Sequence, residues 1–163
     1  MSLHETLDIA GRLALRLHAP DGRVVDERVA SNDITIHGRG LVASLFNTKV
    51  EPPVPRVSRM CVGSSGDPFD PQKNALGKVE TCVPITSVEE STVTDAGGKP
   101  RRRLRITGEL GTAQGNAELR EAGLFTPENA RDPAAEVMYN RVTFKPINKS
   151  PEFQLTLVWD IIF

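Results

Sequence analysis

The chain has 163 residues, of which 39% are hydrophobic and 25% charged, and its formal net charge is −1. These values are typical of one soluble globular domain with its own core, and we expect a single domain over residues 1–163. The near-zero charge argues against direct contact with nucleic acid or an anionic membrane. Aromatic residues make up only 5% of the chain, which argues against a surface that stacks sugars or single-stranded bases.

Two cysteines, Cys61 and Cys82, bear on the redox compartment. The amino terminus "MSLHETLDIAG" lacks the basic and apolar regions of a secretory signal, and no apolar run is long enough to span a bilayer. We therefore expect synthesis in a reducing cytoplasm and two free thiols. A disulfide would require the strands that carry the two cysteines to be neighbours.

Residues 7–30 are predicted to form a β-hairpin. Every second position carries an apolar residue or glycine, which is the period of a strand with one buried face. These residues are Leu7, Ile9, Gly11, Leu13, Leu15 and Leu17. The sequence "PDG" at residues 20–22 then supplies a turn, because proline fixes φ and glycine accepts positive φ. The return strand follows this turn.

The segment "HGRGLVASLFN" is predicted to contain the one short helix of the chain. Its large apolar residues fall at helical spacing, so they share one face. We expect this face to cover an open end of the fold. These residues are Leu41, Val42, Leu45 and Phe46.

Residues 56–62 and 79–85 are predicted as strands, separated by an exposed loop rich in turn-forming residues. Val79, Thr81, Val83 and Ile85 alternate in the second strand. Pro84 lies inside this run and indicates an edge strand or a bulge, because proline has no N–H to donate to a ladder.

The basic run from Lys99 to Arg105 has two interpretations. It could bind phosphate groups, or it could be neutralised within a hairpin closed by the glycine-rich turn that precedes it. We favour the hairpin, in which Glu89 and Glu90 lie opposite Arg103 and Arg105 and form a modestly stabilising charge ladder.

Further strands are predicted at 117–125, 136–144 and 152–163. In the last strand, one face carries Phe153, Leu155, Leu157, Trp159, Ile161 and Phe163. The opposite face also becomes apolar toward its end, and a strand that is apolar on both faces needs cover on both sides. We therefore expect Val158, Ile162 and Phe163 to contact another subunit or a partner.

Many short strands with turn signals between them, and only one helix, predict an all-β fold. The expected architecture is an antiparallel β-sandwich, jelly-roll-like in character, with one short helix.

No motif in the sequence provides a catalytic, metal-binding or cofactor-binding site. The segment "VGSSGD" at residues 62–67 departs from both the nucleophile elbow and the phosphate-binding loop. Asp67 and Asp70 lack the further acidic ligands that a calcium loop needs. Three isolated histidines show no metal-binding spacing: His4, His18 and His37. An enzyme assembled from distant residues stays open as an alternative.

The stretch "AELREAGLF" at residues 117–125 combines charges with a glycine and two large apolar residues. Alternation puts Leu119, Glu121, Gly123 and Phe125 on one face. Burying the Glu121 carboxylate is costly unless it is paired, so its partner must lie on another strand, a helix end or another subunit. Gly123 allows a second backbone to approach closely, or a bulge. We expect Glu121 and Gly123 to contact a subunit or partner; an ordinary edge strand is the alternative.

The segment Leu119–Phe125 resembles the "I-R-E-I-G-L-Y/F" signature of bacteriophage tail-collar fibre proteins and related tail or virion structural proteins. Other segments resemble that group in the same order, and together they cover most of the chain from about residue 32 onward. These segments are "NDITIHGRGLVASLF", "RMCVGSSGDPFDP", residues 74–80 and residues 147–149.

The resemblance implies a non-enzymatic structural protein of a phage or phage-like particle, assembled in the bacterial cytoplasm. It would be a tail, collar or fibre-attachment protein that forms a symmetric homo-oligomer and contacts other virion or tail proteins. It would need no cofactor and would contact neither nucleic acid nor a membrane directly. A capsid decoration protein is one alternative, and a small β-sandwich enzyme is the alternative from a different class.

Overall fold

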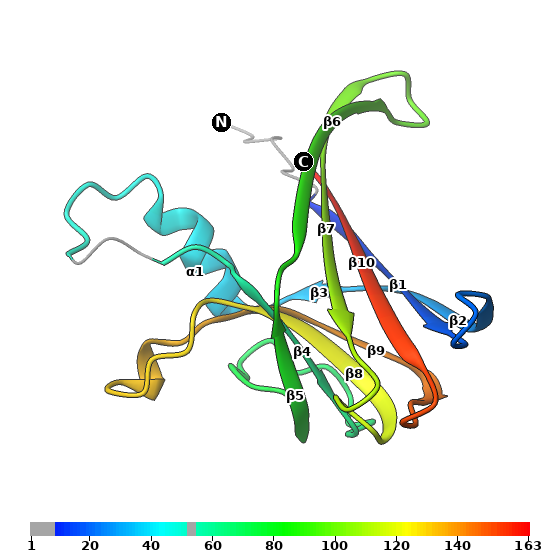
Figure 1. Cartoon of the computed structure of the whole chain (residues 1–163). Coiled ribbons are helices and arrows are strands. Elements are labelled where there is room, and N and C mark those ends of the chain that lie inside the picture. Colours follow the sequence, from blue (N-terminus) through cyan, green and yellow to red (C-terminus); the bar gives the residue numbers. More distant parts are fainter. Residues whose placement is uncertain (1–8, 52–54) are drawn as a thin grey trace.

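The computed structural model describes residues 9–51 and 55–163, and these form a sandwich of two five-stranded antiparallel sheets (Figure 1). Sheet A has the order β2 (Val24–Ser31), β1 (Ala10–His18), β10 (Gln154–Ile162), β7 (Pro100–Leu110), β6 (Ser87–Thr94). Sheet B has the order β3 (Asp33–Ile34), β9 (Met138–Asn148), β8 (Glu118–Phe125), β4 (Arg59–Gly63), β5 (Val79–Pro84). The prediction of an all-β sandwich is confirmed. Leu7 and His4 lie outside the described residues.

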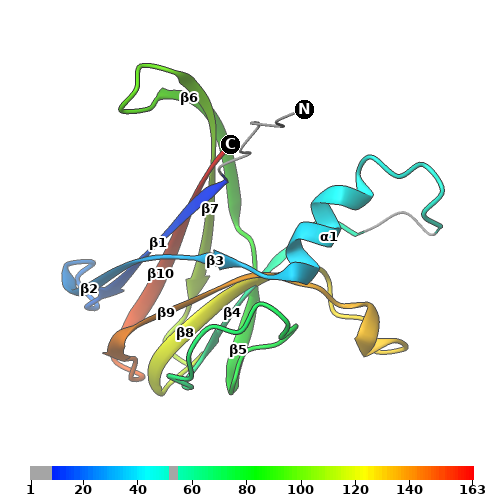
Figure 2. The ribbon, with the colours of Figure 1, turned by 180° about the vertical axis from the view of Figure 1, so that it is seen from behind.

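The chain crosses between the two sheets along both sides of the sandwich. On one side β2 leads through Asn32 directly into β3, and on the other side β5 leads through residues 85–86 into β6 (Figure 2). The edge strands of the two sheets are therefore consecutive in the sequence. Pro84 lies at such an edge, as its position in the sequence predicted, because β5 is the last strand of sheet B.

The core lies between the sheets and is dominated by the inward-facing row of β10. Leu155, Leu157 and Trp159 are fully buried and Ile161 nearly so, which confirms the predicted apolar face over these four residues; of the two flanking residues, Phe153 is partly buried and Phe163 is exposed. The indole Nε1 of Trp159 donates a hydrogen bond of 2.9 Å to Oδ1 of Asn32. This bond satisfies the polar atom of the largest core side chain and ties the crossing between β2 and β3 to the centre of sheet A.

One helix packs at an end of the sandwich, as predicted. It is α1 (Ile36–Ser44), and a short 3₁₀ helix η1 (Pro133–Ala135) lies between β8 and β9. The hairpin of β6 and β7 is also as predicted, with Glu89 opposite Arg105. Glu90 is shifted from its expected place: it lies opposite Leu104 and forms an ion pair of 2.7 Å with Arg102.

Strand β8 departs from the simple alternation predicted for it. Leu119 shares the main core with Ala122 and Leu124, whereas Glu121 lies on the outer face. The register with β9 shifts between Leu119 and Glu121, next to Pro146, which cannot donate to the ladder. This irregularity puts Leu119 on the core side, so the expected grouping of Leu119 with Glu121 is wrong.

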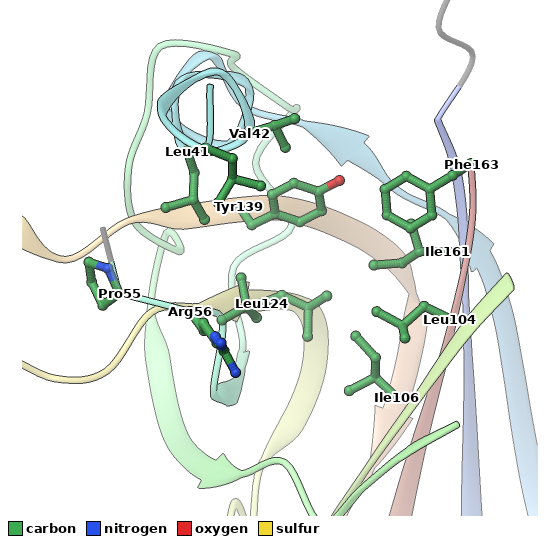
Figure 3. Close-up of a pocket in the computed structure, with 12 residues that line it drawn as sticks. Leu41, Val42, Pro55, Arg56, Leu104, Ile106, Leu124, Tyr139, Ile161 and Phe163 are labelled. Atoms are coloured by element: carbon green, nitrogen blue, oxygen red, sulfur yellow. The ribbon is translucent and has the colours of Figure 1, made fainter. Parts of the chain in front are cut away.

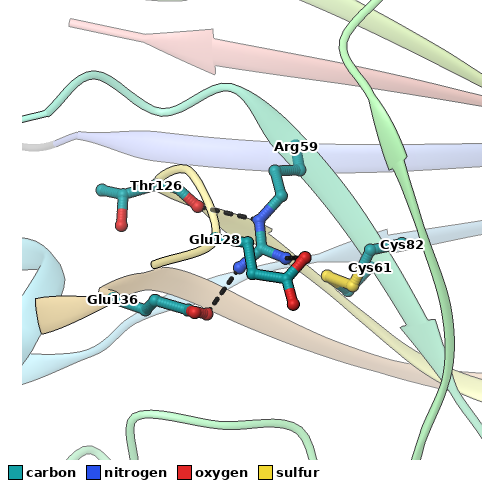
Figure 4. Close-up of a disulfide and its surroundings, with 6 residues drawn as sticks. All are labelled: Arg59, Cys61, Cys82, Thr126, Glu128 and Glu136. Carbon is teal, nitrogen blue, oxygen red and sulfur yellow. Dashed lines mark hydrogen bonds and ion pairs between the residues drawn. A yellow bond between two sulfur atoms is a disulfide. The ribbon is translucent and has the colours of Figure 1, made fainter. Parts of the chain in front are cut away.

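Cys61 and Cys82 form a disulfide, so the expectation of two free thiols is wrong. The two residues lie directly opposite each other on β4 and β5, with their Cα atoms 4.0 Å apart. Arg59 lies beside them (Figure 4), where its Nε donates 2.9 Å to the carbonyl oxygen of Thr126 and its guanidinium pairs at 2.6 Å with Glu136. The prediction followed the expected compartment because the sequence did not show that the two strands are neighbours, and it is this strand pairing that brings the two sulfur atoms together.

Reducing this disulfide is predicted to destabilise the protein. The bridge joins residues 21 apart in the sequence, and closing a loop of this size is worth about 3 kcal/mol in the free energy of unfolding. Urea denaturation with and without dithiothreitol measures the difference. The double variant Cys61→Ser, Cys82→Ser should match the reduced protein and should not respond to the reductant. Two reactive thiols in the unfolded but unreduced protein would contradict the pairing.

Candidate interaction surface

Helix α1 is held against β9 by its first turn. The hydroxyl of Thr35 accepts a hydrogen bond of 2.9 Å from the backbone N–H of Gly38 and donates one of 2.6 Å to the carbonyl oxygen of Met138. A Cβ atom at Gly38 would lie 2.0 Å from the carbonyl oxygen of Tyr139, so only glycine permits this approach. The N-cap and the glycine together fix the helix at one end of the sandwich.

An apolar cavity of about 280 Å³ lies beneath α1, where the two sheets diverge (Figure 3). Both sheets, the helix and the segment before β4 supply its walls. The lining residues are Leu41, Val42, Leu45, Pro55, Arg56, Val57, Leu104, Ile106, Leu124, Tyr139, Ile161 and Phe163.

Few polar atoms reach this cavity. Its polar side chains are Arg56, which is exposed, and Tyr139, whose ring is buried; burial raises the pKa of the Tyr139 hydroxyl, which keeps it neutral. A cavity of this character favours a non-polar group over a charged or strongly hydrated one.

Large apolar side chains are exposed beside the cavity. Leu45, which lines it, is 76% exposed, and the next residue, Phe46, is 84% exposed. We expected both to cover the end of the fold together with Leu41 and Val42. Leu45 keeps a helical backbone after the helix ends at Ser44, and the N–H groups of Leu45 and Phe46 bond to the carbonyl oxygens of Val42 and Ala43, but both side chains are largely exposed to solvent.

The buried carboxylate of Glu121 finds all its partners within the chain. Arg141 on β9 donates from Nε at 2.8 Å, and the backbone N–H groups of Ser65, Gly77 and Lys78 donate at 3.2, 3.0 and 2.8 Å. Nη1 of Arg141 also donates to the carbonyl oxygens of residues 67 and 68. The pair therefore fastens the loop between β4 and β5 onto the outer face of sheet B.

The structure places Glu121 and Gly123 inside the chain, where we had expected partner contacts. Glu121 is 0% exposed, and Gly123 is also buried. A Cβ atom at Gly123 would lie 2.8 Å from the carbonyl oxygen of Asn140, so the close approach expected at this glycine is to a strand of the same chain. Neither residue offers surface to a second molecule in this conformation.

The three expected contact residues of β10 and its end have accessible surface. Val158 and Ile162 are half-buried on the outer face of sheet A, and Phe163 is 43% exposed and lines the cavity. Contact of Val158, Ile162 and Phe163 with a partner stays a prediction.

An ion pair lies beside Val158 on the same face. Asp160 accepts two hydrogen bonds from Arg105, of 2.7 and 2.8 Å, and these bonds lower the pKa of Asp160.

The residues considered for an enzyme or a metal site lie apart from the apolar cavity. The carboxylate of Asp70 accepts a hydrogen bond from the backbone N–H of Gln72, and the His37 ring bonds to the backbone carbonyl oxygen of Gln72. The His18 ring bonds to the hydroxyl of Thr156, in sheet A. Within residues 9–51 and 55–163, no three His, Cys, Asp or Glu side chains gather as a metal site would require. No helix in the same described ranges is long and apolar enough to cross a membrane.

Sequence reasoning did not find the cavity, because its walls come from segments far apart in the chain. Leu104 lies on β7 of sheet A, whereas Leu124 and Tyr139 lie on β8 and β9 of sheet B, so these side chains meet only when the two sheets pack together. Two signals pointed toward it: the apolar helix residues expected to cover an open end of the fold, and Phe163, which was expected to contact a partner. No protein-family model, curated protein or solved structure matches the chain.

Removing the carboxylate of Glu121 is predicted to destabilise the fold strongly. Glu121→Ala leaves Arg141 buried without its counter-ion, which costs about 3–5 kcal/mol in the free energy of unfolding. Glu118→Ala, on the same strand, removes a carboxylate that pairs with Arg120 at the surface, and should cost less than about 1 kcal/mol. Urea denaturation of both variants measures the contrast. Equal losses would show that Glu121 does not hold the loop.

Proposed function

We propose that this protein is a structural, non-enzymatic component of a phage or phage-like particle, acting as a tail, collar or fibre-attachment protein that assembles symmetrically. The observation that carries the proposal is the apolar cavity at the end of the sandwich, with Leu45, Phe46 and Phe163 exposed beside it. Its occupant is a non-polar side chain of a neighbouring protein in the same particle.

The energetics of this surface favour docking. Burying a fully exposed Leu or Phe side chain contributes about 1.5–3 kcal/mol, so Leu45 and Phe46 supply a substantial part of an interaction energy once a partner covers them. Exposed apolar clusters of this kind mark interaction sites in soluble proteins. A fixed cavity beside the cluster adds a place where a partner's side chain can anchor.

The walls of the cavity favour docking over catalysis. A site that turns over a small molecule combines apolar walls with several placed polar groups that orient the substrate. Here the lining offers the phenol of Tyr139 and the exposed side chain of Arg56. The buried carboxylate of Glu121 is engaged by a guanidinium and three backbone N–H groups, which is a structural use of that group.

Two further features support a particle protein. The ordered resemblance to tail-collar fibre and virion structural proteins covers most of the chain from about residue 32, including the β8 segment Leu119–Phe125. The disulfide between Cys61 and Cys82 suits a protein that works after release from a reducing cytoplasm, as a particle component does.

The protein is expected to purify with particles from the bacterium that produces it. Particles are separated on a density gradient, and an antibody with gold labelling then locates the protein on tail, collar or head. Gold on the tail or collar agrees with the proposal, whereas gold on the head would identify a decoration protein instead. Absence of the protein from the particles would refute the proposed function.

The variant Leu45→Asp is expected to reduce incorporation into particles at least tenfold, because a charge beside the cavity opposes burial against a non-polar partner. Val24→Asp is the matched control. Val24 is also an exposed apolar residue, at 46%, but it lies opposite His18, at the other end of β1. Quantitative blotting of gradient-purified particles measures both variants. Equal incorporation would exclude the cavity as the docking surface.

A further inference from the structure

The outer edge of β6 carries an uninterrupted row of backbone hydrogen-bonding groups. The other three edge strands of the described sheets are protected. β3 has only two residues, and β5 carries Pro84 and the disulfide. β2 has a register shift, and its Arg28 side chain donates to two carbonyl oxygens of β9. β6 has eight residues without proline and pairs with β7 without a register shift. Because natural edge strands are usually interrupted, an uninterrupted one indicates a pairing surface.

The register of the hairpin identifies the groups that face this free edge. The backbone N–H and C=O of Arg102 on β7 bond to Phe163, at 3.2 and 2.9 Å, and therefore point away from β6. Thr92 lies opposite Arg102, and residues of such a pair direct their backbone groups away from each other. The N–H and C=O of Thr92 thus face the free edge. Alternation gives the full row: Val88, Glu90, Thr92 and Thr94.

Both carboxylates of β6 have an arginine of β7 near them, which offsets their charge at this edge. Glu90 forms its ion pair with Arg102, and Glu89 lies opposite Arg105. Nε of Arg103 also donates 3.0 Å to the hydroxyl of Ser91. β6 is the last strand of sheet A, so no strand of the described residues pairs with its outer edge, and the end of the hairpin extends beyond β10 (Figure 1).

We propose that β6 pairs antiparallel with β6 of a second copy of this chain, about a two-fold axis at Ser91. Two copies of sheet A then form one continuous sheet, a recognised mode of strand addition. In this register Glu90 lies opposite Thr92 of the second copy, and Val88 lies opposite Thr94. The four such pairs provide about eight backbone hydrogen bonds.

Charge and the number of paired residues together select this register. Backbone hydrogen bonds between the two copies form only where outward-facing residues lie opposite each other. The outward-facing residues of β6 are the even-numbered ones, so the two-fold axis must pass through a residue and not between two residues. Axes at Val88 and Val93 set no like charges opposite each other, but they pair fewer of the four outward-facing residues than the axis at Ser91 does.

An axis at Glu89 or at Glu90 sets two identical carboxylates opposite each other. An axis at Thr92 sets Glu89 opposite Asp95. Like charges directly opposite destabilise a strand pair, and the axis at Ser91 is free of such an opposition.

The proposed function includes a symmetric assembly, and the β6 pairing would be one contact within it. The role of this pairing in a particle therefore rests on the proposed function. The association itself depends only on β6. Sedimentation velocity of the purified protein from low micromolar to near-millimolar concentration is expected to show a monomer–dimer equilibrium. Hydrogen exchange should slow with concentration at the amides of Val88, Glu90, Thr92 and Thr94. A protein that stays monomeric throughout would overturn the pairing, while its presence in particles is decided separately by gradient purification.

Three variants test the edge and its register. Thr92→Pro removes an outward N–H that makes no bond within the hairpin, and should abolish the dimer. Thr92→Glu should weaken it about tenfold, because the new carboxylate faces Glu90 of the second copy. It should leave the monomer folded, since position 92 lies opposite Arg102. Thermal unfolding checks the fold of each variant.

The exchanged variant Glu90→Thr, Thr92→Glu has the same composition as the wild type and again sets Glu opposite Thr about Ser91. It should dimerise like the wild type, and failure to do so would refute this register. A dimer that survives Thr92→Glu unchanged would refute pairing through β6. If such a dimer were lost in Leu45→Asp, the association would belong to the apolar cavity instead.

Discussion

Burial of the inward row of β10 is the interaction on which the rest of the structure depends. Leu155, Leu157, Trp159 and Ile161 lie in the core, and each contributes about 1.5–3 kcal/mol relative to an exposed side chain. β10 is the central strand of sheet A, so this row fixes β1 on one side and β7 on the other. Both candidate surfaces lie near the carboxyl end of β10. The cavity is lined by Ile161 and Phe163 of this end, and the hairpin of β6 and β7 extends past it.

Buried charge imposes a second constraint, on sheet B. The carboxylate of Glu121 requires compensation, and it obtains this from Arg141 and from a loop that folds over the sheet. Beside the start of β8, the ammonium group of Lys149 is satisfied by the carbonyl oxygens of Thr112 and Ser150 and the side chain of Asn116. In both cases a charged side chain fixes a loop, because only that loop can supply the missing hydrogen bonds.

The two candidate surfaces differ in the physics of recognition. The cavity with Leu45 and Phe46 gains free energy by removing apolar area from water, which is tolerant of the partner's exact geometry. The edge of β6 gains from directional backbone hydrogen bonds, which demand one strand direction and one register. The two proposals therefore assign the chain two separate docking surfaces, one for a non-polar partner and one for a second copy.

The sequence by itself determined the strands, the helix and the hairpin of β6 and β7, because alternation, helical spacing and turn residues are local properties. It also indicated that Glu121 needed a partner, since the cost of burying a carboxylate follows from its chemistry. Only the tertiary structure decided that the partner is Arg141, that Cys61 pairs with Cys82, and that Leu119 faces the core. Each of these depends on which distant strands become neighbours and on where their register shifts. The cavity was beyond sequence reasoning for the same reason: its walls meet only when both sheets and the helix are in place.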